Sequence, residues 1–226
     1  SSMANTAREA EVPIVAGDTK VVEKGKADGL FITTSGLAWV PDNLHIGGAN
    51  AKPGDAVLIS GTLGDHGIAV LTARGDLGFE TEVQSDVAPL NNLIEKVVRI
   101  CPDIHVLRDP TRGGLATTLN EIALQSNVGI LLNEEIIPVQ LAVRTACELL
   151  GYDPLYVANE GKVIVILPQS EVPPVLKAMR SHPYGKGSVQ IGNITTEPSR
   201  RVLMKTRIGG TRVLDMLAGE MLPRIC

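Results

Sequence analysis

The sequence predicts an α+β sandwich, a sheet with helices packed on one face. Short β-branched and aliphatic runs alternate with amphipathic stretches of helical period, but without strict strand–helix–strand order. Two Gly-rich turns each lead from a predicted strand into a predicted helix. Hydrophobic residues make up 44% of the 226 residues and aromatic residues only 3%, so we expect a core of Val, Ile, Leu and Ala.

The predicted elements begin with a helix over residues 1–11. Residues 12–22 predict a strand, a Gly-Asp turn and a second β-branched stretch, and residues 29–40 predict a longer strand. Pro, Gly and Asn cluster at 40–55, which predicts a domain boundary. The strands expected after it are 56–60, 104–109, 129–134, 155–168, 188–197 and 201–208. The helices expected after it are 64–76, 86–100, 113–127, 139–151 and 170–182. An Asn-Glu-Gly break divides 155–168, so this stretch is either two strands or one sharply bent strand.

Composition and charge limit the class of function. The net charge of −4, without any Lys/Arg run, argues against a nucleic-acid surface. The longest apolar run, 163–168, is too short to span a membrane, and residues 1–12 lack the apolar region of a secretory signal. Three cysteines without paired spacing indicate a reducing compartment, so we expect a cytoplasmic protein.

The motif GDTKVV begins at Gly17 and places Asp18 and Lys20 on the same side of an extended segment. One interpretation is functional: the carboxylate binds Mg²⁺ and the ammonium neutralises phosphate oxygens. The alternative is a hairpin turn with a surface lysine, and the motif alone favours this alternative.

Both Gly-rich turns have the design of an anion site, because a helix N-terminus presents free N–H donors. In SGTLGDHG, residues 60–67, Asp65 is either a site residue or only the N-cap. In LRDPTRGGLAT, residues 107–117, Thr111 is a candidate N-cap and Arg112 could clamp a phosphate or carboxylate. A capped helix with a solvated arginine is the simpler alternative for the second turn.

The segment VANEGKVIVI places Asn159, Glu160 and Lys162 at a strand end. Glu160 could act as a general base if burial raises its pKa, although a lone carboxylate here is more often a turn residue. The four histidines have no metal-type spacing, so no zinc site is expected. Cys101 and Cys147 lie in apolar surroundings, which predicts buried structural thiols.

The last residue, Cys226, carries a thiol beside the α-carboxylate. A terminal nucleophile is either incidental or reaches toward something. The six residues 221–226 span about 20 Å when extended, which is enough to carry a thiol from a buried site to an external acceptor. Pro223 limits their conformations, and a prenylation signal is excluded because the cysteine is not four residues from the end.

Taken together, GDTKVV, GTLGDHG, RDPTRGGLATTLNEIA, ANEGK and the terminal PRIC resemble the HypE family of hydrogenase maturation factors. PRIC is the most specific motif, whereas Asp-Pro-Thr-Arg-Gly-Gly is shared across the aminoimidazole ribonucleotide synthetase superfamily. The resemblance implies a remnant of an N-terminal barrel-forming domain at 1–43, which binds ATP and forms a homodimer. It implies a complete α/β sandwich like the C-terminal domain of PurM at 44–226, with a flexible reactive tail at about 221–226. It also implies an N-terminal truncation of roughly a hundred residues, so we expect this chain to be impaired in ATP binding, dimerisation and turnover.

The chemistry implied by the resemblance is that of a carbamoyl dehydratase using ATP and Mg²⁺. A HypF-type carbamoyltransferase would load the terminal thiol, and dehydration would turn the S-carboxamide into a thiocyanate. The cyano group would then pass to iron on a HypC–HypD scaffold, in maturation of [NiFe] hydrogenase. The implied catalytic residues are Cys226, Glu160 as base and Lys20 as charge stabiliser. The implied cofactor-binding residues are Asp18 (also the metal ligand), Asp65, Asp109, Arg112 and Asn159, the last orienting the carbamoyl amide.

Two alternatives remain open at this point. Another ATP-dependent synthetase of the same superfamily would share the turns but has no need of a C-terminal thiol. A catalytically silent fragment would only bind a maturation partner through its second domain.

Overall fold

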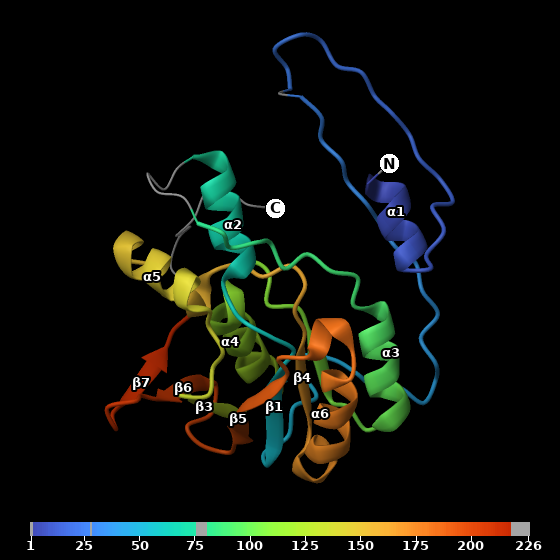
Figure 1. Cartoon of the computed structure of the whole chain (residues 1–226). Helices are drawn as coiled ribbons and strands as arrows, with labels where there is room; N and C mark the ends of the chain where they lie inside the picture. The colour runs from blue at the N-terminus through green and yellow to red at the C-terminus, as the bar shows by residue number, and fades with distance from the viewer. Residues whose placement is uncertain (1, 28, 76–80, 218–226) are drawn as a thin grey trace. The chain divides into compact units, whose positions relative to one another are not determined.

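The computed structural model describes residues 2–27, 29–75 and 81–217, and the chain divides into two units, 1–43 and 44–226 (Figure 1). The division falls inside the Pro-, Gly- and Asn-rich segment 40–55. Each unit is described by itself.

The described part of the first unit contains helix α1 (Ser2–Glu9) and otherwise has no helix or strand. The helix expected at 1–11 is therefore confirmed, whereas the strands expected at 12–22 and 29–40 are wrong. A strand is stabilised by a hydrogen-bonded neighbour, and these β-branched stretches have none within the described residues. Their apolar side chains are exposed instead, Leu37 and Trp39 completely.

The second unit contains five α-helices and seven strands in its described residues. The helices are α2 (Asp65–Arg74), α3 (Asn91–Ile100), α4 (Gly114–Ser126), α5 (Leu141–Leu150) and α6 (Val172–Arg180). The strands are β1 (Asp55–Ile59), β2 (Val106–Arg108), β3 (Gly129–Asn133), β4 (Ile164–Pro168), β5 (Val189–Thr195), β6 (Arg201–Lys205) and β7 (Thr211–Leu214). Three short 3₁₀ turns complete the unit: η1 (Pro154–Tyr156), η2 (Gln169–Glu171) and η3 (Pro183–Gly185).

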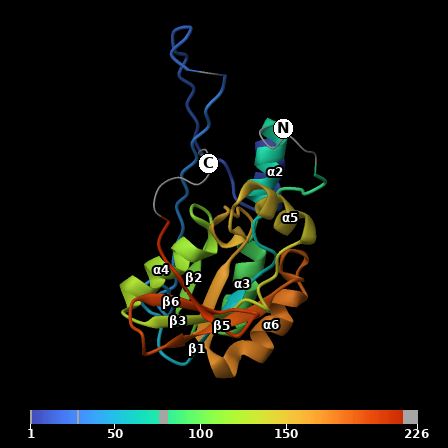
Figure 2. The ribbon, with the colours of Figure 1, turned by 90° about the vertical axis from the view of Figure 1, so that its left-hand side faces the viewer.

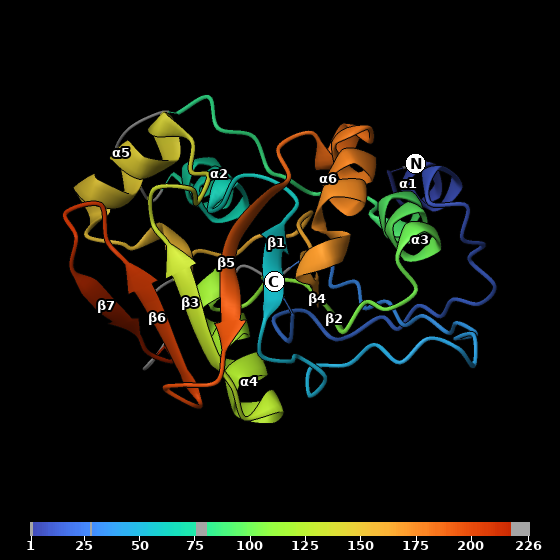
Figure 3. The same ribbon diagram turned by 90° about the horizontal axis from the view of Figure 1, so that it is seen from below.

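The strands form one sheet in the order β2-β4-β1-β5-β3-β6-β7. Strands β3 and β6 pair in parallel, and the other neighbours pair antiparallel. In β1, Val57 and Ile59 pack in the core that contains α4, while Ala56 and Leu58 pack in the core that contains α3 and α6. Figure 2 shows the sheet between α4 on one side and α3 with α6 on the other, and Figure 3 shows α3 and α6 side by side. The α+β sandwich is confirmed, but the expected placement of all helices on one face is wrong.

Two expected elements differ from the structure near the site. The helix expected at 86–100 begins only at Asn91, and residues 86–90 form neither helix nor strand. The stretch 155–168 is not two strands: its first part is the η1 turn followed by an irregular segment, and its second part is β4. Strand β7 was not expected from the sequence.

The sheet brings three distant segments together at one edge. Strands β1 and β2 both pair antiparallel with β4, and their last residues, Ile59 and Arg108, both lie opposite Ile164, the first residue of β4. The Gly-rich turns that follow β1 and β2 therefore meet the segment 159–162 that precedes β4. Most of the side chains expected in the site lie on these three segments.

Candidate functional site

Asn159 connects the two Gly-rich turns. Its Oδ1 accepts a hydrogen bond from the backbone N–H of Gly64 at 2.8 Å, and its Nδ2 donates to the carbonyls of Pro110 and Val157, both at 3.0 Å. The side chain is 0% exposed. All polar atoms of this amide therefore bond within the protein. Asn159 holds the turns in place and has no atom left to orient a carbamoyl amide, which is the role that the resemblance implied.

Asp65 is the first residue of α2 and lies at the centre of a buried polar cluster. The N-cap is Gly64 (φ 82°), not Asp65. Thr62 donates a short hydrogen bond to Asp65 Oδ2, Gln140 donates to Oδ1 at 3.0 Å, and Lys162 Nζ lies 3.9 Å from Oδ2. Burial raises the pKa of Asp65, and the hydrogen bonds from Thr62 and Gln140 and the Lys162 charge only partly offset this.

Lys162 forms its closest ion pair with Asp86, a residue of the irregular segment before α3. The Nζ–Oδ2 distance is 3.0 Å, and both side chains are largely buried, at 11% and 3% exposed. The other oxygen of Asp86 accepts a hydrogen bond from the backbone N–H of Glu160, also at 3.0 Å. Gly161 lies against Asp86 so closely that a Cβ on it would overlap the Asp86 carbonyl oxygen.

The Glu160 side chain is half-buried beside this pair. Its Oε1 is buried and has no hydrogen-bond partner among the described residues. A buried carboxylate oxygen without a partner is rare in proteins and costs free energy. Such an atom is suited to accept a proton or a hydrogen bond from a ligand.

A polar cavity of about 390 Å³ opens beside these residues. Four segments and Gln140 form its wall, and most of their residues are polar or charged. The segments contribute Ser60, Gly61, Thr62 and Asp65; Gln84, Ser85, Asp86, Val87 and Ala88; Gly161 and Lys162; and Pro183, Tyr184, Lys186 and Gly187. Gly61 lies against the Lys162 side chain, since a Cβ there would be 3.0 Å from Cε. The glycine therefore leaves the lysine room to line the cavity.

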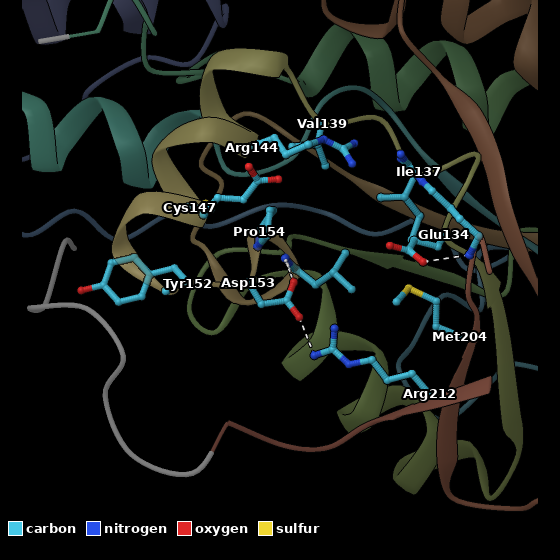
Figure 4. Close-up of a pocket in the computed structure, with 14 residues that line it drawn as sticks. Glu134, Ile137, Val139, Arg144, Cys147, Tyr152, Asp153, Pro154, Met204 and Arg212 are labelled. Atoms are coloured by element: carbon cyan, nitrogen blue, oxygen red, sulfur yellow. Dashed lines mark hydrogen bonds and ion pairs between the residues drawn. The ribbon is translucent and has the colours of Figure 1, made fainter. Parts of the chain in front are cut away.

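A second cavity, of about 400 Å³, lies between α5, η1 and the β6–β7 turn (Figure 4). Figure 4 shows Asp153 and Arg212 paired at its wall, with 2.5 Å between Oδ2 and Nη2. Asp153 also accepts a hydrogen bond from the backbone of Leu155. None of the residues expected in the site from the sequence lines this cavity, so the polar cavity is the candidate site.

The second Gly-rich turn contributes differently from expectation. Gly113 (φ 74°) is the N-cap of α4, so the prediction of Thr111 as N-cap is wrong; its hydroxyl donates to Asp109 instead. Asp109 and Arg112 are both exposed. Gly114 (φ 62°) would collide through a Cβ with the carbonyls of Leu155 and Val157, which explains the glycine.

Of the expected site residues that the structure describes, only Asp65 lines this cavity, whereas Asn159, Glu160, Asp109 and Arg112 lie on the adjoining turns without lining it. The other three expected site residues lie elsewhere in the chain. Asp18 and Lys20 belong to the first unit, where both are exposed and Asp18 accepts a hydrogen bond from the backbone of Thr19. Cys226 lies outside the described residues. Their roles therefore stay predictions.

Sequence reasoning did not assign Thr62, Asp86, Gln140 or Lys162 to the site. Lys162 was recognised in its motif but given no role, and Asp86 was placed in a helix. One signal in the sequence indicates that Asp86 lies before the helix and not in it. Pro89 disfavours helical conformation in the residue before it, so the helix has to begin later than Asp86.

Cys101 and Cys147 are buried, as expected. Burial raises the pKa of both thiols, that of Cys147 to about 11, with smaller contributions there from Asp153 and Glu148. Among the described residues, no three His, Cys, Asp or Glu are placed to hold a metal ion together. Every helix that the structure describes is too short or too polar to cross a membrane.

The fold and the match to known families define the class of protein. Residues 52–205 match the model of the AIR synthase related protein, C-terminal domain. The match covers all strands from β1 to β6 in full, and it includes the candidate site.

More similar relatives give the family within this class. The chain is 56% identical over 225 residues to carbamoyl dehydratase HypE of Cupriavidus necator and 54% identical to that of Azotobacter vinelandii. It is also similar to the crystal structure of Escherichia coli HypE, with a TM-score of 0.92 and 45% identity over all of this chain and 69% of that one. The chain belongs to the HypE family of hydrogenase maturation proteins.

Two further solved relatives contain a ligand or a partner. One is hydrogenase maturation protein HypE in complex with ATP (TM-score 0.88, 45% identity, covering all of this chain and 68% of that one). The other is a HypE–HypF complex (TM-score 0.86, 47% identity, covering 96% of this chain and 70% of that one). The chain spans 64% and 66% of the length of the C. necator and A. vinelandii relatives.

Proposed function

We propose that this chain contributes the thiol carrier and part of the catalytic site of an ATP-dependent carbamoyl dehydratase in [NiFe]-hydrogenase maturation. The observation that carries the proposal is the 56% identity, across this whole chain, to a protein named carbamoyl dehydratase. The ATP and HypF complexes of relatives support ATP as co-substrate and a HypF-type carbamoyltransferase as donor. Transfer of cyanide to iron on HypC–HypD, and a homodimer of the whole protein, complete the proposal.

The proposed reaction dehydrates an S-carboxamide on Cys226 to a thiocyanate. ATP supplies the phosphoryl group that makes the amide oxygen a leaving group. The oxygen then departs as phosphate with the electron pair of the C–O bond. Both N–H protons of the amide are lost, and their electron pairs complete the C≡N triple bond.

Glu160 is the proposed base for these protons. Its buried, unpartnered Oε1 supports this role, because a base must have an acceptor atom that the protein leaves open. Asn159 supports the base indirectly in this proposal, since it holds the segment before Glu160 against both Gly-rich turns.

Lys20 is the proposed stabiliser of charge that develops on the phosphoryl oxygens. Asp18 is the proposed Mg²⁺ ligand. A single carboxylate fits a magnesium ion that takes its other ligands from water and phosphate. Asp65, Asp109 and Arg112 are proposed to contribute to nucleotide binding at the turns, as helix N-termini favour phosphate.

Intact-mass spectrometry of the full-length protein tests this function. Incubation with HypF, carbamoyl phosphate and ATP should give first a carbamoyl and then a cyano adduct, and Cys226→Ala should give neither. Glu160→Gln should accumulate the carboxamide, because the amide protons lose their acceptor. Glu135→Gln removes an exposed carboxylate and should react as the wild type does. An adduct on the Cys226→Ala protein, or full conversion by Glu160→Gln, would contradict the respective assignment.

A further inference from the structure

The irregular segment 81–90 contributes residues 84–88 to one wall of the polar cavity, and its place is fixed from two sides. Ser85 Oγ is hydrogen-bonded to His66 Nδ1 of α2 at 2.9 Å. The next residue, Asp86, bonds to the turn 160–162. The segment therefore connects the first turn of α2 to the turn that carries the proposed base.

Asp86 uses its two carboxylate oxygens for two different groups of that turn. Oδ1 accepts the backbone N–H of Glu160, and Oδ2 accepts the ammonium group of Lys162, each at 3.0 Å. The Glu160 main chain and the Lys162 side chain are thus set by one carboxylate. The overlap that any Cβ on Gly161 would cause with the Asp86 carbonyl shows how closely the segment crosses the turn.

The charges of Asp86 and Lys162 determine the role of Asp86. Lys162 also lies 3.9 Å from Asp65, beyond hydrogen-bond distance, so Asp86 is its closer partner. Both carboxylates and the ammonium are largely buried. A buried charge that loses one partner is left uncompensated, so the ammonium would move toward Asp65 if Asp86 were neutral.

We infer that Asp86 is a positioning residue of the site: it holds Lys162 at the cavity wall, away from Asp65, and orders the backbone beside Glu160. The inference rests on the proposed function. Lys162 then offers a fixed cation to an oxygen that gains charge during the dehydration, without the cost of reorienting a free lysine. Asp86 itself does not touch the reacting atoms and acts through Lys162 and Glu160.

A double-mutant cycle in the full-length protein tests the inference. Asp86→Asn keeps an oxygen for the Glu160 N–H but turns a donor toward Lys162, and should slow single-turnover thiocyanate formation about 100-fold. Lys162→Met should slow it by a similar factor. The double variant, which removes both members of the Asp86–Lys162 pair, should be no slower than Lys162→Met alone. Asp103→Asn, the same change on an exposed aspartate, should keep the wild-type rate.

Two results would overturn the inference: a wild-type rate for Asp86→Asn, or effects of the two substitutions that multiply in the double variant. Circular dichroism shows whether each variant folds. If Asp86→Asn alone does not fold, the rate of the double variant relative to that of Lys162→Met tests the inference.

A measurement that does not depend on catalytic activity separates this inference from the proposed function. Loss of the Asp86 charge by itself lowers the pKa of Asp65, and a closer Lys162 lowers it further, so Asp86→Asn should lower this pKa more in the wild-type background than in Lys162→Met. Carboxyl carbon NMR measures this shift in the chain itself. Wild-type protein that forms no thiocyanate would defeat the proposed function, while an equal shift of the Asp65 pKa with and without Lys162 would defeat the positioning role.

Discussion

The side-chain oxygen of Asn159 accepts a hydrogen bond from the backbone N–H of Gly64, 95 residues earlier in the chain. The same amide donates to Pro110, so one buried side chain connects the ends of β1 and β2 with the start of β4. The site is therefore held together by a residue that exposes no atom to a ligand.

Replacing Asn159 with leucine should destabilise the second unit strongly. The variant leaves the Gly64 N–H and the Val157 carbonyl without their buried partner, at a cost of about 3 kcal/mol in the free energy of unfolding. Urea denaturation followed by circular dichroism measures this loss. Asn92→Leu, an exposed asparagine in α3, is the control and should change stability by about 0.5 kcal/mol at most. If Asn159→Leu lost no more stability than the Asn92→Leu control, the hydrogen bonds of Asn159 would contribute little to the stability of the second unit.

The Asp65→Asn variant should gain stability relative to the wild type as the pH rises. Burial raises the pKa of Asp65 in the folded state above its ordinary value of 3.8, so between the two pKa values the folded state binds more protons than the unfolded state. The wild type therefore loses stability as the pH rises through the folded pKa, whereas asparagine does not titrate. Denaturation series from about pH 3 to neutrality measure the difference between the two proteins. A difference that shrinks with rising pH would refute the sign of this shift.

Cys147 should resist thiol reagents until the second unit unfolds. Burial raises its pKa from an ordinary value of 9.0 to about 11, which lowers the thiolate fraction about 100-fold at pH 8, and the residue is 1% exposed. A Cys226→Ser background leaves only the two buried thiols, Cys101 and Cys147. Ellman's reagent should then react slowly in buffer and rapidly with both thiols in urea. Rapid reaction of a thiol in buffer would show that the core opens easily at that position.

The elements that the sequence predicted well are those whose pattern is local. Helix α4 lies between Gly113 and Asn127, its two caps, which are both in left-handed conformation, and its bounds follow from turn chemistry alone. The expected burial of Cys147 likewise follows from the apolar face of one helix. These features require no knowledge of distant residues.

The layer arrangement was mispredicted although a local signal was present. All five residues of β1 are buried, and so are the first four of β4. An uninterrupted apolar run of this kind is typical of a strand covered on both faces, whereas a strand with one covered face alternates. The runs 56–59 and 163–167 thus already indicated helices on both sides of the sheet.

The centre of the candidate site could not be assembled from the sequence. Asp86 and Lys162 are 76 residues apart, and their contact depends on how an irregular segment crosses a turn. No periodicity encodes such a crossing. Glu160 and Asp65 were found because each lies in a recognisable Gly-containing motif, whereas Asp86 has no motif of its own.

Trp39, the single tryptophan of the chain, has a completely exposed side chain in the first unit. Its fluorescence is therefore that of a solvated indole already in the folded chain, and the emission will not follow the unfolding of the second unit. The same property makes the residue an intrinsic optical probe for the first unit. Any protein or nucleotide that covers this segment should shift the emission to shorter wavelength, without a label and without interference from the sheet domain.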